Sequence, residues 1–343
     1  MTPDLVVVGG GIIGLSCAWQ AQQAGMHVQV LDARGPGEGA SRRAAGMLLP
    51  DIEGEHDPAE RDFGRRSYEI YPRFAADVEA AGGQPTGYAR CSCCLVAQSK
   101  ERAQSLRHME WGAFLEAPAL AAEMPGIGES FGARRGPAAQ VEPRQLVEAL
   151  ASGLRRRGAE IETGLAAADV RRGPRGVEGV QMADGTMRQG ARYLFATGAW
   201  AGTMPYLAER GLVTEPVRGE IVTLEDSGDE PLADIIFGQG IYLAPKGGRK
   251  VYLGATEERA GFDERPTAGG TLHLLEGLRR LYPAAMRWQV RETWAGLRPY
   301  RAGGPLIARI DDNAVAAAGH HRNGILLAPA TAERVLALLA ELQ

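Results

Sequence analysis

Three glycines between an apolar strand-like segment and a helical segment constrain this chain more than any other feature. Residues 5–8 form a short apolar, β-branched run, and Gly9, Gly11 and Gly14 follow in the spacing Gly-x-Gly-x-x-Gly. A helical pattern comes next, and a second strand-like run ends on Asp32. This order predicts a βαβ unit of the dinucleotide-binding type, complete in about thirty residues.

Each of these residues has a physical role in such a unit. Gly9 permits a tight turn, Gly11 lets the backbone approach a pyrophosphate, and Gly14 lets the helix pack on the strand. The N-terminus of the helix offers free N–H groups and partial positive charge to the phosphates. Asp32 is placed to accept both ribose hydroxyls, and its carboxylate would repel a 2′-phosphate, so NADP is disfavoured.

The other glycine clusters indicate which dinucleotide to expect. Gly35, Gly37 and Gly39 lack a third glycine at the required spacing, and the pair at 247–248 lies between two strand-like runs. The chain therefore carries one fingerprint, and a second one for a nicotinamide domain is missing. One dinucleotide site together with a separate α+β region favours FAD that meets its substrate directly.

Length and charge narrow the class of protein. The 343 residues exceed the roughly 250–300 at which a single core stops growing, so two domains are expected. The formal net charge is −4, and the densest basic run, residues 155–157, lies at the end of a predicted helix, where cations are favourable. No nucleic-acid partner is predicted.

The cysteines and the apolar runs exclude further classes. Cys17, Cys91, Cys93 and Cys94 have no fourth soft ligand or nearby histidine pair in a metal-binding spacing, so we expect small buried side chains and no metal site. No apolar run approaches the ~20 residues that span a bilayer, and the start of the chain lacks the basic residues of a signal peptide. A cytoplasmic protein without a membrane contact is expected.

Hydrophobic periodicity and turn signals predict the remaining elements. Helices are expected at 63–81, 143–158 and 272–282, and a final helix is expected from Thr331, as its N-cap, to Leu342. Strands are expected at 88–97, 193–196, 220–224, 241–244, 250–253 and 314–318, with a short polar meander at 169–189.

Several longer motifs, in order along the chain, resemble one known family. They are VVVGGGIIGLSCAW, VLDA, GASRRAAGML, VEPRQL, FATGAW, PVRGE, IYLAPKGGRKVYLGATEE, ETWAGLRPY and GHHRNGILLAPATA. Together they resemble the glycine oxidase branch of the D-amino acid oxidase family of flavoproteins, from residue 5 to the C-terminus. The most specific part is WAGLRP followed by GHxRNGILLAP. Glycine oxidases of this type make the glycine imine that is used for the thiazole of thiamine.

The resemblance implies a set of residues around non-covalently bound FAD. Ile12 and Ile13 would lie at the helix start with the fingerprint glycines, and Asp32 with Ala33 at the ribose. The further implied contacts are Ala40 and Ser41 near the phosphates, Ala45, Gly46 and Met47 beside the isoalloxazine, Ala167 at the adenine, Thr197 and Gly198 near the adenylate end, and His320, His321, Arg322, Asn323, Gly324, Ile325 and Leu326 at the pyrimidine edge.

The resemblance also implies the substrate site. Arg298 and Tyr242 match the family's carboxylate-binding pair, Arg322 matches its arginine on the amine side of the pocket, and Met47 would border the substrate. The planar guanidinium of an arginine can hold a carboxylate by two parallel hydrogen bonds. If the amino acid binds as a neutral amine, a hydride can pass from Cα to flavin N5, so no general base is required. Packing in the core is the expected role of Trp294.

These implications lead to an expected architecture and reaction. A Rossmann-like α/β FAD-binding domain (residues 1–85, 140–215 and 295–343) would be interleaved with a smaller mixed-sheet α+β substrate domain (86–139 and 216–294). The expected reaction is oxidative deamination of glycine with dioxygen as acceptor, by a homo-oligomer. Two alternatives remain open: an oxidase or dehydrogenase of D-amino acids, sarcosine or another small amine, and a flavin-binding regulatory subunit without turnover.

Two segments depart from the family pattern. Arg42 and Arg43 stand where small or aromatic residues are expected before AAGML, and they add charge close to the phosphates. The loop YRAGGPLIARI after WAGLRP differs from the usual Asp-Gly-x-Pro-x-Ile-Gly. Both departures bear on substrate size and loop geometry and leave the cofactor expectation unchanged.

Overall fold

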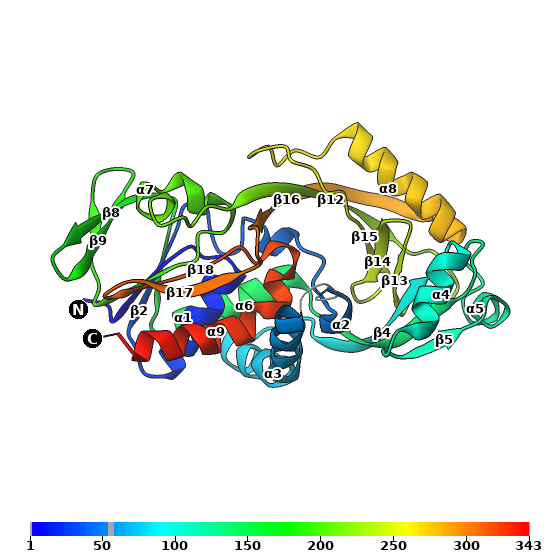
Figure 1. The fold of residues 1–343 in the computed structure, drawn as a ribbon, viewed down its shortest axis with the longest axis horizontal. Helices are drawn as coiled ribbons and strands as arrows, with labels where there is room; N and C mark the ends of the chain where they lie inside the picture. Colours follow the sequence, from blue (N-terminus) through cyan, green and yellow to red (C-terminus); the bar gives the residue numbers. More distant parts are fainter. Residues whose placement is uncertain (1, 54–57, 343) are drawn as a thin grey trace. The chain divides into compact units, whose positions relative to one another are not determined.

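A computed structural model describes residues 2–53 and 58–342 of the chain. Contacts divide it into two units, each made of segments distant in sequence (Figure 1). Unit 1 comprises residues 1–86, 143–217 and 297–343, and unit 2 comprises residues 87–142 and 218–296. Their identification with an FAD-binding and a substrate-binding domain stays a prediction.

Unit 1 is built on a six-stranded sheet in the order β17-β18-β11-β1-β2-β7, in which every pairing but β17–β18 is parallel. Its strands are β1 (Leu5–Val8), β2 (Val28–Asp32), β7 (Glu160–Thr163), β11 (Arg192–Phe195), β17 (Leu306–Asp311) and β18 (Ala314–Ala318). The parallel order with β1 central is that of a Rossmann-like unit, and the predicted α/β fold class is confirmed.

The two faces of this sheet are covered differently (Figure 1). The helices α1 (Ile12–Gln23), α3 (Pro58–Gly82), α6 (Pro143–Arg156) and α9 (Gly324–Ala340) pack against one another below the sheet in that view. On the other face lie a three-stranded antiparallel sheet of β8 (Ala167–Gly173), β9 (Gly176–Met182) and β10 (Met187–Arg188), and the short helix α7 (Pro205–Ala208). The remaining short elements of unit 1 are η1 (Ser41–Arg43), β3 (Met47–Leu48), α2 (Pro50–Glu53), η2 (Gly198–Thr203) and η4 (His321–Asn323).

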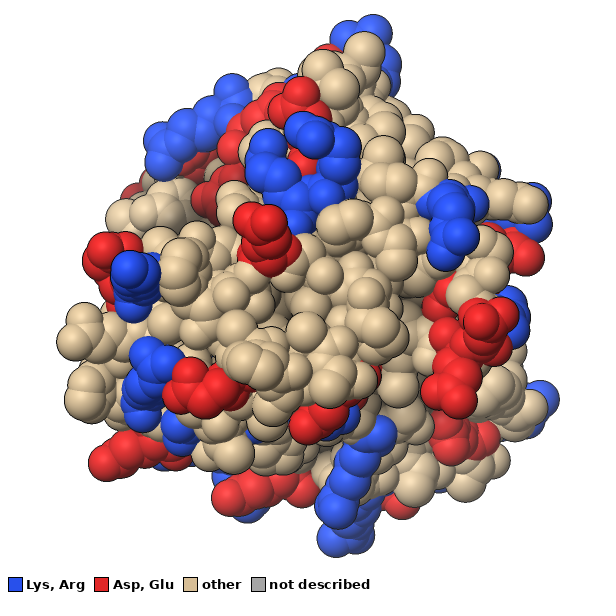
Figure 2. Space-filling model, turned by 90° about the vertical axis from the view of Figure 1, so that its right-hand side faces the viewer, with Lys and Arg blue, Asp and Glu red and all other residues tan. Residues whose placement is uncertain are grey.

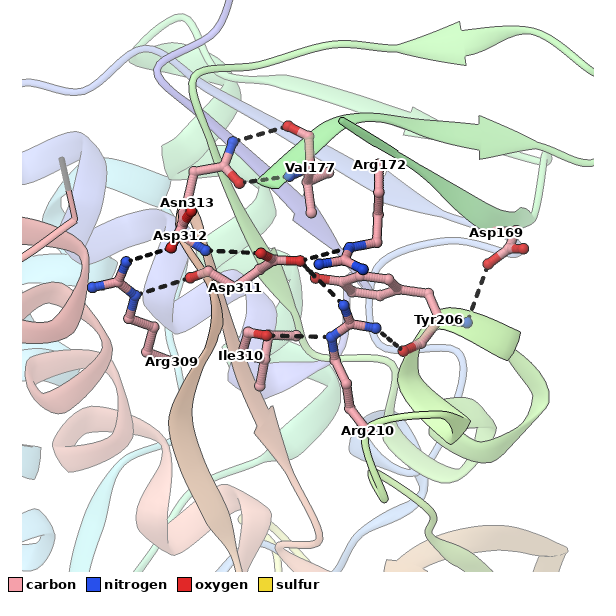
Figure 3. Close-up of polar contacts among 10 residues, drawn as sticks. All are labelled: Asp169, Arg172, Val177, Tyr206, Arg210, Arg309, Ile310, Asp311, Asp312 and Asn313. Atoms are coloured by element: carbon pink, nitrogen blue, oxygen red, sulfur yellow. Dashed lines mark hydrogen bonds and ion pairs between the residues drawn. The ribbon is translucent and has the colours of Figure 1, made fainter. Parts of the chain in front are cut away.

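A polar network around one carboxylate fastens the three-stranded sheet and α7 to the β17–β18 hairpin (Figure 3). The Asp311 carboxylate accepts hydrogen bonds from Arg172 Nε at 3.0 Å, Arg210 Nη2 at 3.1 Å and Tyr206 OH at 3.2 Å. The Asp311 side chain is only 9% exposed, so these charge-assisted bonds are better protected from solvent than a surface ion pair. Asn313 adds two hydrogen bonds to the backbone of β9. The polar meander thus has a structural role.

Unit 2 contains a largely antiparallel sheet in the order β16-β12-β15-β14-β13-β4-β6, with β5 paired to β6. Its strands are β4 (Ala89–Val96), β5 (Ala113–Leu115), β6 (Ala133–Gln140), β12 (Glu215–Glu225), β13 (Ile235–Gly238), β14 (Ile241–Pro245), β15 (Lys250–Gly254) and β16 (Gln289–Tyr300), of which β12 and β16 continue into unit 1. The helical elements are α4 (Lys100–His108), α5 (Ala117–Glu123), α8 (Ala268–Leu281) and η3 (Pro283–Arg287). Apolar side chains of α8 pack on β14 and β15.

The surface of unit 2 near α4 and α5 carries charges of both signs (Figure 2). Among the coloured residues in that view, blue and red side chains are interspersed around a broad tan area. The described residues on this face form no patch of purely positive or purely negative charge.

The predicted start of the last helix is wrong. Thr331 is not an N-cap but lies fully buried inside α9, which begins seven residues earlier at Gly324 and continues through Pro329. Proline cannot donate to the carbonyl four residues before it, here that of Ile325. The hydroxyl of Tyr71 on α3 donates to this carbonyl instead, at 3.0 Å. A tertiary hydrogen bond therefore replaces the missing helical one.

Ser67, one turn before Tyr71 on α3, supports the same stretch of α9. Its Oγ donates to the Leu326 carbonyl at 2.6 Å and accepts from the Ala330 N–H at 3.2 Å. Among the described residues, 321–340 is the one helical segment long and apolar enough to cross a membrane, by length and composition alone. Of its most apolar window, 61% is buried, and α9 packs on α1 and α3 as a core helix does.

The four cysteines agree with the expectation of small buried side chains in three cases. Cys17, Cys93 and Cys94 are buried, and Cys91 is half-buried. Burial raises the pKa of Cys17 beyond its ordinary range and that of Cys91 to about 11. Within residues 2–53 and 58–342, no group of three or more possible metal ligands comes together.

Candidate cofactor and substrate site

The carboxyl ends of four adjacent strands in unit 1 carry the residues that the sequence singled out. Gly9 follows β1, Asp32 ends β2, Thr197 comes two residues after β11, and Gly319 follows β18. The register pairs Val8 with Phe195, the last residue of β11, and with Leu31, the residue before the end of β2, so these positions lie along one edge of the sheet. Ligands of open parallel sheets bind at this edge, where the loops can splay apart.

The turn after β1 requires glycine at two positions. Gly9 has a φ of +108°, and a Cβ there would lie 2.3 Å from the Ala196 carbonyl oxygen. At Gly14, a Cβ would lie 1.9 Å from the Gly9 carbonyl oxygen, so the first turn of α1 packs directly on the strand end. At Gly11, a Cβ would meet only the Ser41 hydroxyl, at 3.4 Å. The backbone at Gly11 is therefore the part of the turn that a phosphate could approach.

The Asp32 carboxylate accepts hydrogen bonds from nearby backbone N–H groups. Its Oδ2 accepts from the Gly10 N–H at 2.7 Å, and its Oδ1 accepts from the N–H groups of Arg34 and Gly35 at 2.9 and 2.8 Å. A carboxylate offers about four acceptor positions, and three are used here. The predicted contact of Asp32 with the ribose hydroxyls stays a prediction. Ala33 follows as an exposed residue.

Residues 40–47 continue this edge. The Ser41 Oγ accepts from the Ile12 N–H at 2.8 Å, which ties η1 to the N-terminus of α1. Ala45 and Gly46 are buried, and Met47 is half-buried. Ala40 immediately precedes η1, and Ile13 lies in the first turn of α1.

Arg42, one of the two arginines before AAGML, pairs with carboxylates of the protein. The guanidinium of Arg42 is paired with Glu38 at 3.4 Å and with Glu148 of α6 at 3.2 Å. These two carboxylates offset its charge, so Arg42 is directed to protein partners. Arg34, which the sequence reasoning overlooked, stacks on the Trp200 ring at 4.6 Å, next to the strand end that carries Asp32. The Asp-x-Arg spacing after β2 was the available signal.

One buried polar atom at this edge has no partner among the residues that the structure describes. The Oγ1 of Thr197 is buried without a hydrogen bond, next to Gly198 with a φ of +58°. A buried hydroxyl without a partner costs about 1–3 kcal/mol, so such an atom indicates a ligand. Together with the open approach at Gly11, this atom fits a dinucleotide at the strand ends. Ala167, the first residue of β8, packs on the apolar cluster that includes Val8.

The loop after β18 leads directly into α9. His320 is 3% exposed, and its Nε2 lies 3.1 Å from the Oγ1 of Thr331. Burial lowers the pKa of His320 to about 4, so the imidazole is neutral at neutral pH. Asn323 Nδ2 donates to Glu60 Oε1 at 3.2 Å. A Cβ at Gly324 would lie 3.9 Å from Ile12 Cγ2, so α9 begins beside the first turn of α1.

His321 and the residues that follow complete this loop. His321 has a φ of +46°, and its ring packs edge-to-face on Tyr300 with centroids 5.2 Å apart. Arg322 is exposed, whereas Ile325 and Leu326 are buried in α9. The structure therefore brings the predicted pyrimidine-edge segment together with the fingerprint at the N-termini of two helices.

The predicted carboxylate-binding residues lie on strands of the second sheet. Tyr242 is half-buried on β14, with its ring 5.5 Å from that of Phe237 and tilted by 49°. Arg298 is half-buried near the end of β16. Trp294, on the same strand, is 6% exposed and packs edge-to-face on Tyr252, which agrees with the core role expected for it.

A buried polar cluster in unit 2 had no sequence signal. Lys246 is 8% exposed, and its Nζ donates to Gln140 Oε1 at 2.9 Å and to the Val141 carbonyl at 3.0 Å. Burial lowers the pKa of Lys246 to about 7, although the nearby carboxylate of Glu142 acts in the opposite direction. That carboxylate accepts from Lys250 Nζ at 2.7 Å. The cluster ties the end of β6 to the β14–β15 hairpin.

Comparison with known proteins places this geometry in a family. Residues 4–338 match the family described as FAD dependent oxidoreductase (DAO). The glycine oxidase of Bacillus licheniformis is 30% identical over 96% of this chain and 91% of its own length. The bifunctional protein ThiO/ThiG of Trichormus variabilis is 33% identical over 99% of this chain, and the match covers 53% of that protein. The chain thus spans about half the length of the bifunctional relatives.

Solved structures give the same result. The crystal structure of glycine oxidase from Bacillus cereus ATCC 14579 has a TM-score of 0.91 to this chain at 27% identity, covering 99% of this chain and 98% of that one. Glycine oxidase from Geobacillus kaustophilus also has a TM-score of 0.91, at 28% identity over 99% of this chain and 95% of that one. The predicted resemblance and the FAD cofactor are confirmed, and the chain belongs to the DAO family of FAD-dependent oxidoreductases.

Proposed function

We propose that this FAD-dependent oxidoreductase oxidises glycine. The observation that carries the proposal is the likeness to glycine oxidases over nine tenths or more of both chains, at 30% identity in the case of Bacillus licheniformis. The arginine and tyrosine of the predicted carboxylate pair are both present, as Arg298 and Tyr242. The balanced reaction is glycine, dioxygen and water giving glyoxylate, ammonia and hydrogen peroxide.

The residues at the strand ends would hold the cofactor. The Gly11 backbone and the N-terminus of α1 would contact the pyrophosphate, and Asp32 would contact a ribose hydroxyl. The buried hydroxyl of Thr197 would form a hydrogen bond with a polar atom of the cofactor. When bound, FAD supplies a two-electron acceptor that takes a hydride at N5 and passes the electrons to dioxygen. The N-terminus of α9 at Gly324 would stabilise negative charge on the ring system.

The chain's own part in the chemistry is to bind and orient the amino acid. The Arg298 guanidinium would hold the carboxylate by two parallel hydrogen bonds, and the Tyr242 hydroxyl would donate a third. Arg322 would border the amine side of the pocket, and Met47 would border the substrate beside the flavin. Because a neutral amine can lose its Cα hydride without a base, positioning and exclusion of water are the required contributions.

Anaerobic titration of the purified yellow holoenzyme tests the substrate. We expect glycine to bleach the flavin, and mixing with glycine in air to yield peroxide and glyoxylate in equal amounts. Reduction by sarcosine or D-alanine but not by glycine would establish the alternative amine specificity, and reduction by no amine would establish a flavin-binding subunit without turnover. A preference for a quinone over dioxygen as acceptor would make the protein a dehydrogenase.

The relatives named ThiO/ThiG support a role in thiamine thiazole synthesis. We propose that the glycine imine leaves the protein for that synthesis, that the chain is a homo-oligomer, and that it works in the cytoplasm. Growth without thiazole after deletion of the gene would contradict the biosynthetic role. Light scattering of the holoenzyme measures the oligomeric state.

A further inference from the structure

The backbone opposite Tyr242 has an unusual relation to its ring. In the register of the β14–β15 hairpin, Tyr242 faces Gly254, the last residue of β15. A Cβ built on Gly254 would lie 2.3 Å from the Tyr242 hydroxyl oxygen, 2.5 Å from Cζ and 2.9 Å from Cε2. The phenol therefore lies across the space that a side chain at Gly254 would fill, as aromatic residues do over a cross-strand glycine.

The backbone at Gly254 cannot easily move away. This residue is paired on both sides, with Tyr242 of β14 and with Ile221 of β12. Two residues later, the Thr256 Oγ1 accepts from the Glu220 N–H at 3.0 Å. A residue that pairs with a neighbouring strand on each side tolerates little displacement of its backbone.

The segment after β15 is held a second time. Arg218 and Glu258 exchange two backbone hydrogen bonds, at 2.8 and 2.9 Å, and the Arg218 guanidinium pairs with the Glu258 carboxylate. The Arg218 side chain is 7% exposed, so this ion pair is largely shielded on the arginine side. If a side chain is added at Gly254, the phenol of Tyr242 must therefore be the group that shifts.

We propose that Gly254 is a positioning residue for the substrate, because its missing side chain lets the Tyr242 phenol lie where it can donate to the substrate carboxylate. The inference rests on the proposed function, in which Tyr242 binds that carboxylate. Ordinary contact begins at 3.4 Å, so a methyl group at Gly254 displaces the phenol oxygen by about 1 Å. A misplacement of ~1 Å can lower the rate of an enzyme by ~100-fold.

The test compares Gly254→Ala with Tyr242→Phe in the FAD-loaded enzyme. We expect Gly254→Ala to keep its flavin and to lower kcat/KM for glycine by about 10- to 100-fold, mainly through KM, because a carboxylate contact contributes to ground-state binding. The dissociation constant of acetate, measured by flavin absorbance, should rise in parallel. Gly269→Ala is the matched control, since a Cβ there meets nothing within 4 Å, and it should leave all values unchanged.

A double substitution separates positioning from a general structural effect. In the Tyr242→Ala background, where the ring is gone, we expect Gly254→Ala to have no further effect on KM. An equal fall in both backgrounds would overturn the proposal, and so would unchanged kinetics of Gly254→Ala when Tyr242→Phe raises KM. If Tyr242→Phe itself leaves KM unchanged, the carboxylate role of Tyr242 has failed, and the positioning role fails with it.

Comparing Gly254→Ala with and without Tyr242→Ala also tests the proposal if Gly254→Ala fails to fold. Should Gly254→Ala yield no folded holoenzyme, the recovery of folded protein in Tyr242→Ala/Gly254→Ala would support the contact between ring and methyl group as the obstacle. Continued failure to fold in the double variant would overturn it.

Discussion

The hydrogen bond from Tyr71 to the Ile325 carbonyl offers the sharpest test of how α9 is built. Tyr71 is fully buried, and its hydroxyl donates at 3.0 Å to the carbonyl that Pro329 cannot reach. Tyr71→Phe leaves the ring in place and the carbonyl unsatisfied. An unsatisfied buried acceptor costs about 1–3 kcal/mol, so we expect the free energy of unfolding to fall by about 2 kcal/mol.

Replacing the proline should make the tyrosine hydroxyl dispensable. In a Pro329→Ala chain, the new N–H at position 329 can donate to the Ile325 carbonyl, so Tyr71→Phe should then cost about 0.5 kcal/mol. The coupling between the two substitutions is therefore about 1.5 kcal/mol, well above the ~0.5 kcal/mol within which independent changes add.

Ser67→Ala is the matched control on the same two helices. The Ala330 N–H and the Leu326 carbonyl that Ser67 joins are helical partners four residues apart, and they can bond directly once the hydroxyl is gone. We therefore expect Ser67→Ala to cost less than Tyr71→Phe, about 1 kcal/mol.

Urea unfolding of the holoenzyme, followed by circular dichroism, measures the free energy of unfolding of the wild type and of the four variants: Tyr71→Phe, Pro329→Ala, their double variant and Ser67→Ala. The values are comparable if the slope of the free energy against urea concentration is unchanged. If Tyr71→Phe costs the same with Pro329 and with alanine at that position, the explanation of how α9 passes through a proline is refuted. The flavin content of each variant shows in addition whether the start of α9 keeps its place beside α1.

Three further predictions concern the cofactor, the substrate and pH. Gly14→Ala should lose FAD, because its Cβ would lie 1.9 Å from the Gly9 carbonyl oxygen, and flavin retained after gel filtration at the level of Gly269→Ala would contradict this. Arg298→Ala should keep FAD but raise KM for glycine by about 30- to 1,000-fold, since an unpaired carboxylate costs roughly 2–5 kcal/mol; an unchanged KM would remove Arg298 from the site. The folded-state pKa of His320, about 4, lies below the unfolded value of about 6.5, so the unfolded chain takes up the proton first. The free energy of unfolding should therefore fall by about 3 kcal/mol as the pH drops from 6.5 to 4. In His320→Gln, the free energy of unfolding measured with urea should change less over this pH range. An equal fall in that variant would exclude His320 as the cause.

The local features of this protein could be predicted because short-range chemistry produces them. Gly9 and Gly14 are required by contacts within a few residues or with the adjacent strand end, and their spacing can be recognised in any chain. The two strands of the first βαβ unit begin and end as expected, at residues 5–8 and 28–32. Helix α6 likewise begins at Pro143, a residue favoured in the first turn.

Features that depend on distant segments were missed or misplaced. The predicted start at Thr331 is wrong because α9 continues through Pro329, where a hydroxyl of α3, more than 250 residues away in sequence, replaces the missing helical hydrogen bond. The three hydrogen bonds that the Asp32 carboxylate accepts from backbone N–H groups were not predicted. Helices α4 and α5, which lie between the predicted strand at 88–97 and the predicted helix at 143–158, were not predicted.

The sequence by itself determined the class of protein, the cofactor and the family, because glycine spacing, strand-end carboxylates and motif order are written along the chain. Only the tertiary structure decided which polar groups are already satisfied and which still need a partner. The Asp311 carboxylate accepts hydrogen bonds from two arginines and a tyrosine, whereas the buried hydroxyl of Thr197 has no partner among the described residues. The ring of Tyr242 lies in the space that a side chain at Gly254 would fill. Such assignments depend on distances between segments far apart in sequence, and these distances exist only once the chain has folded.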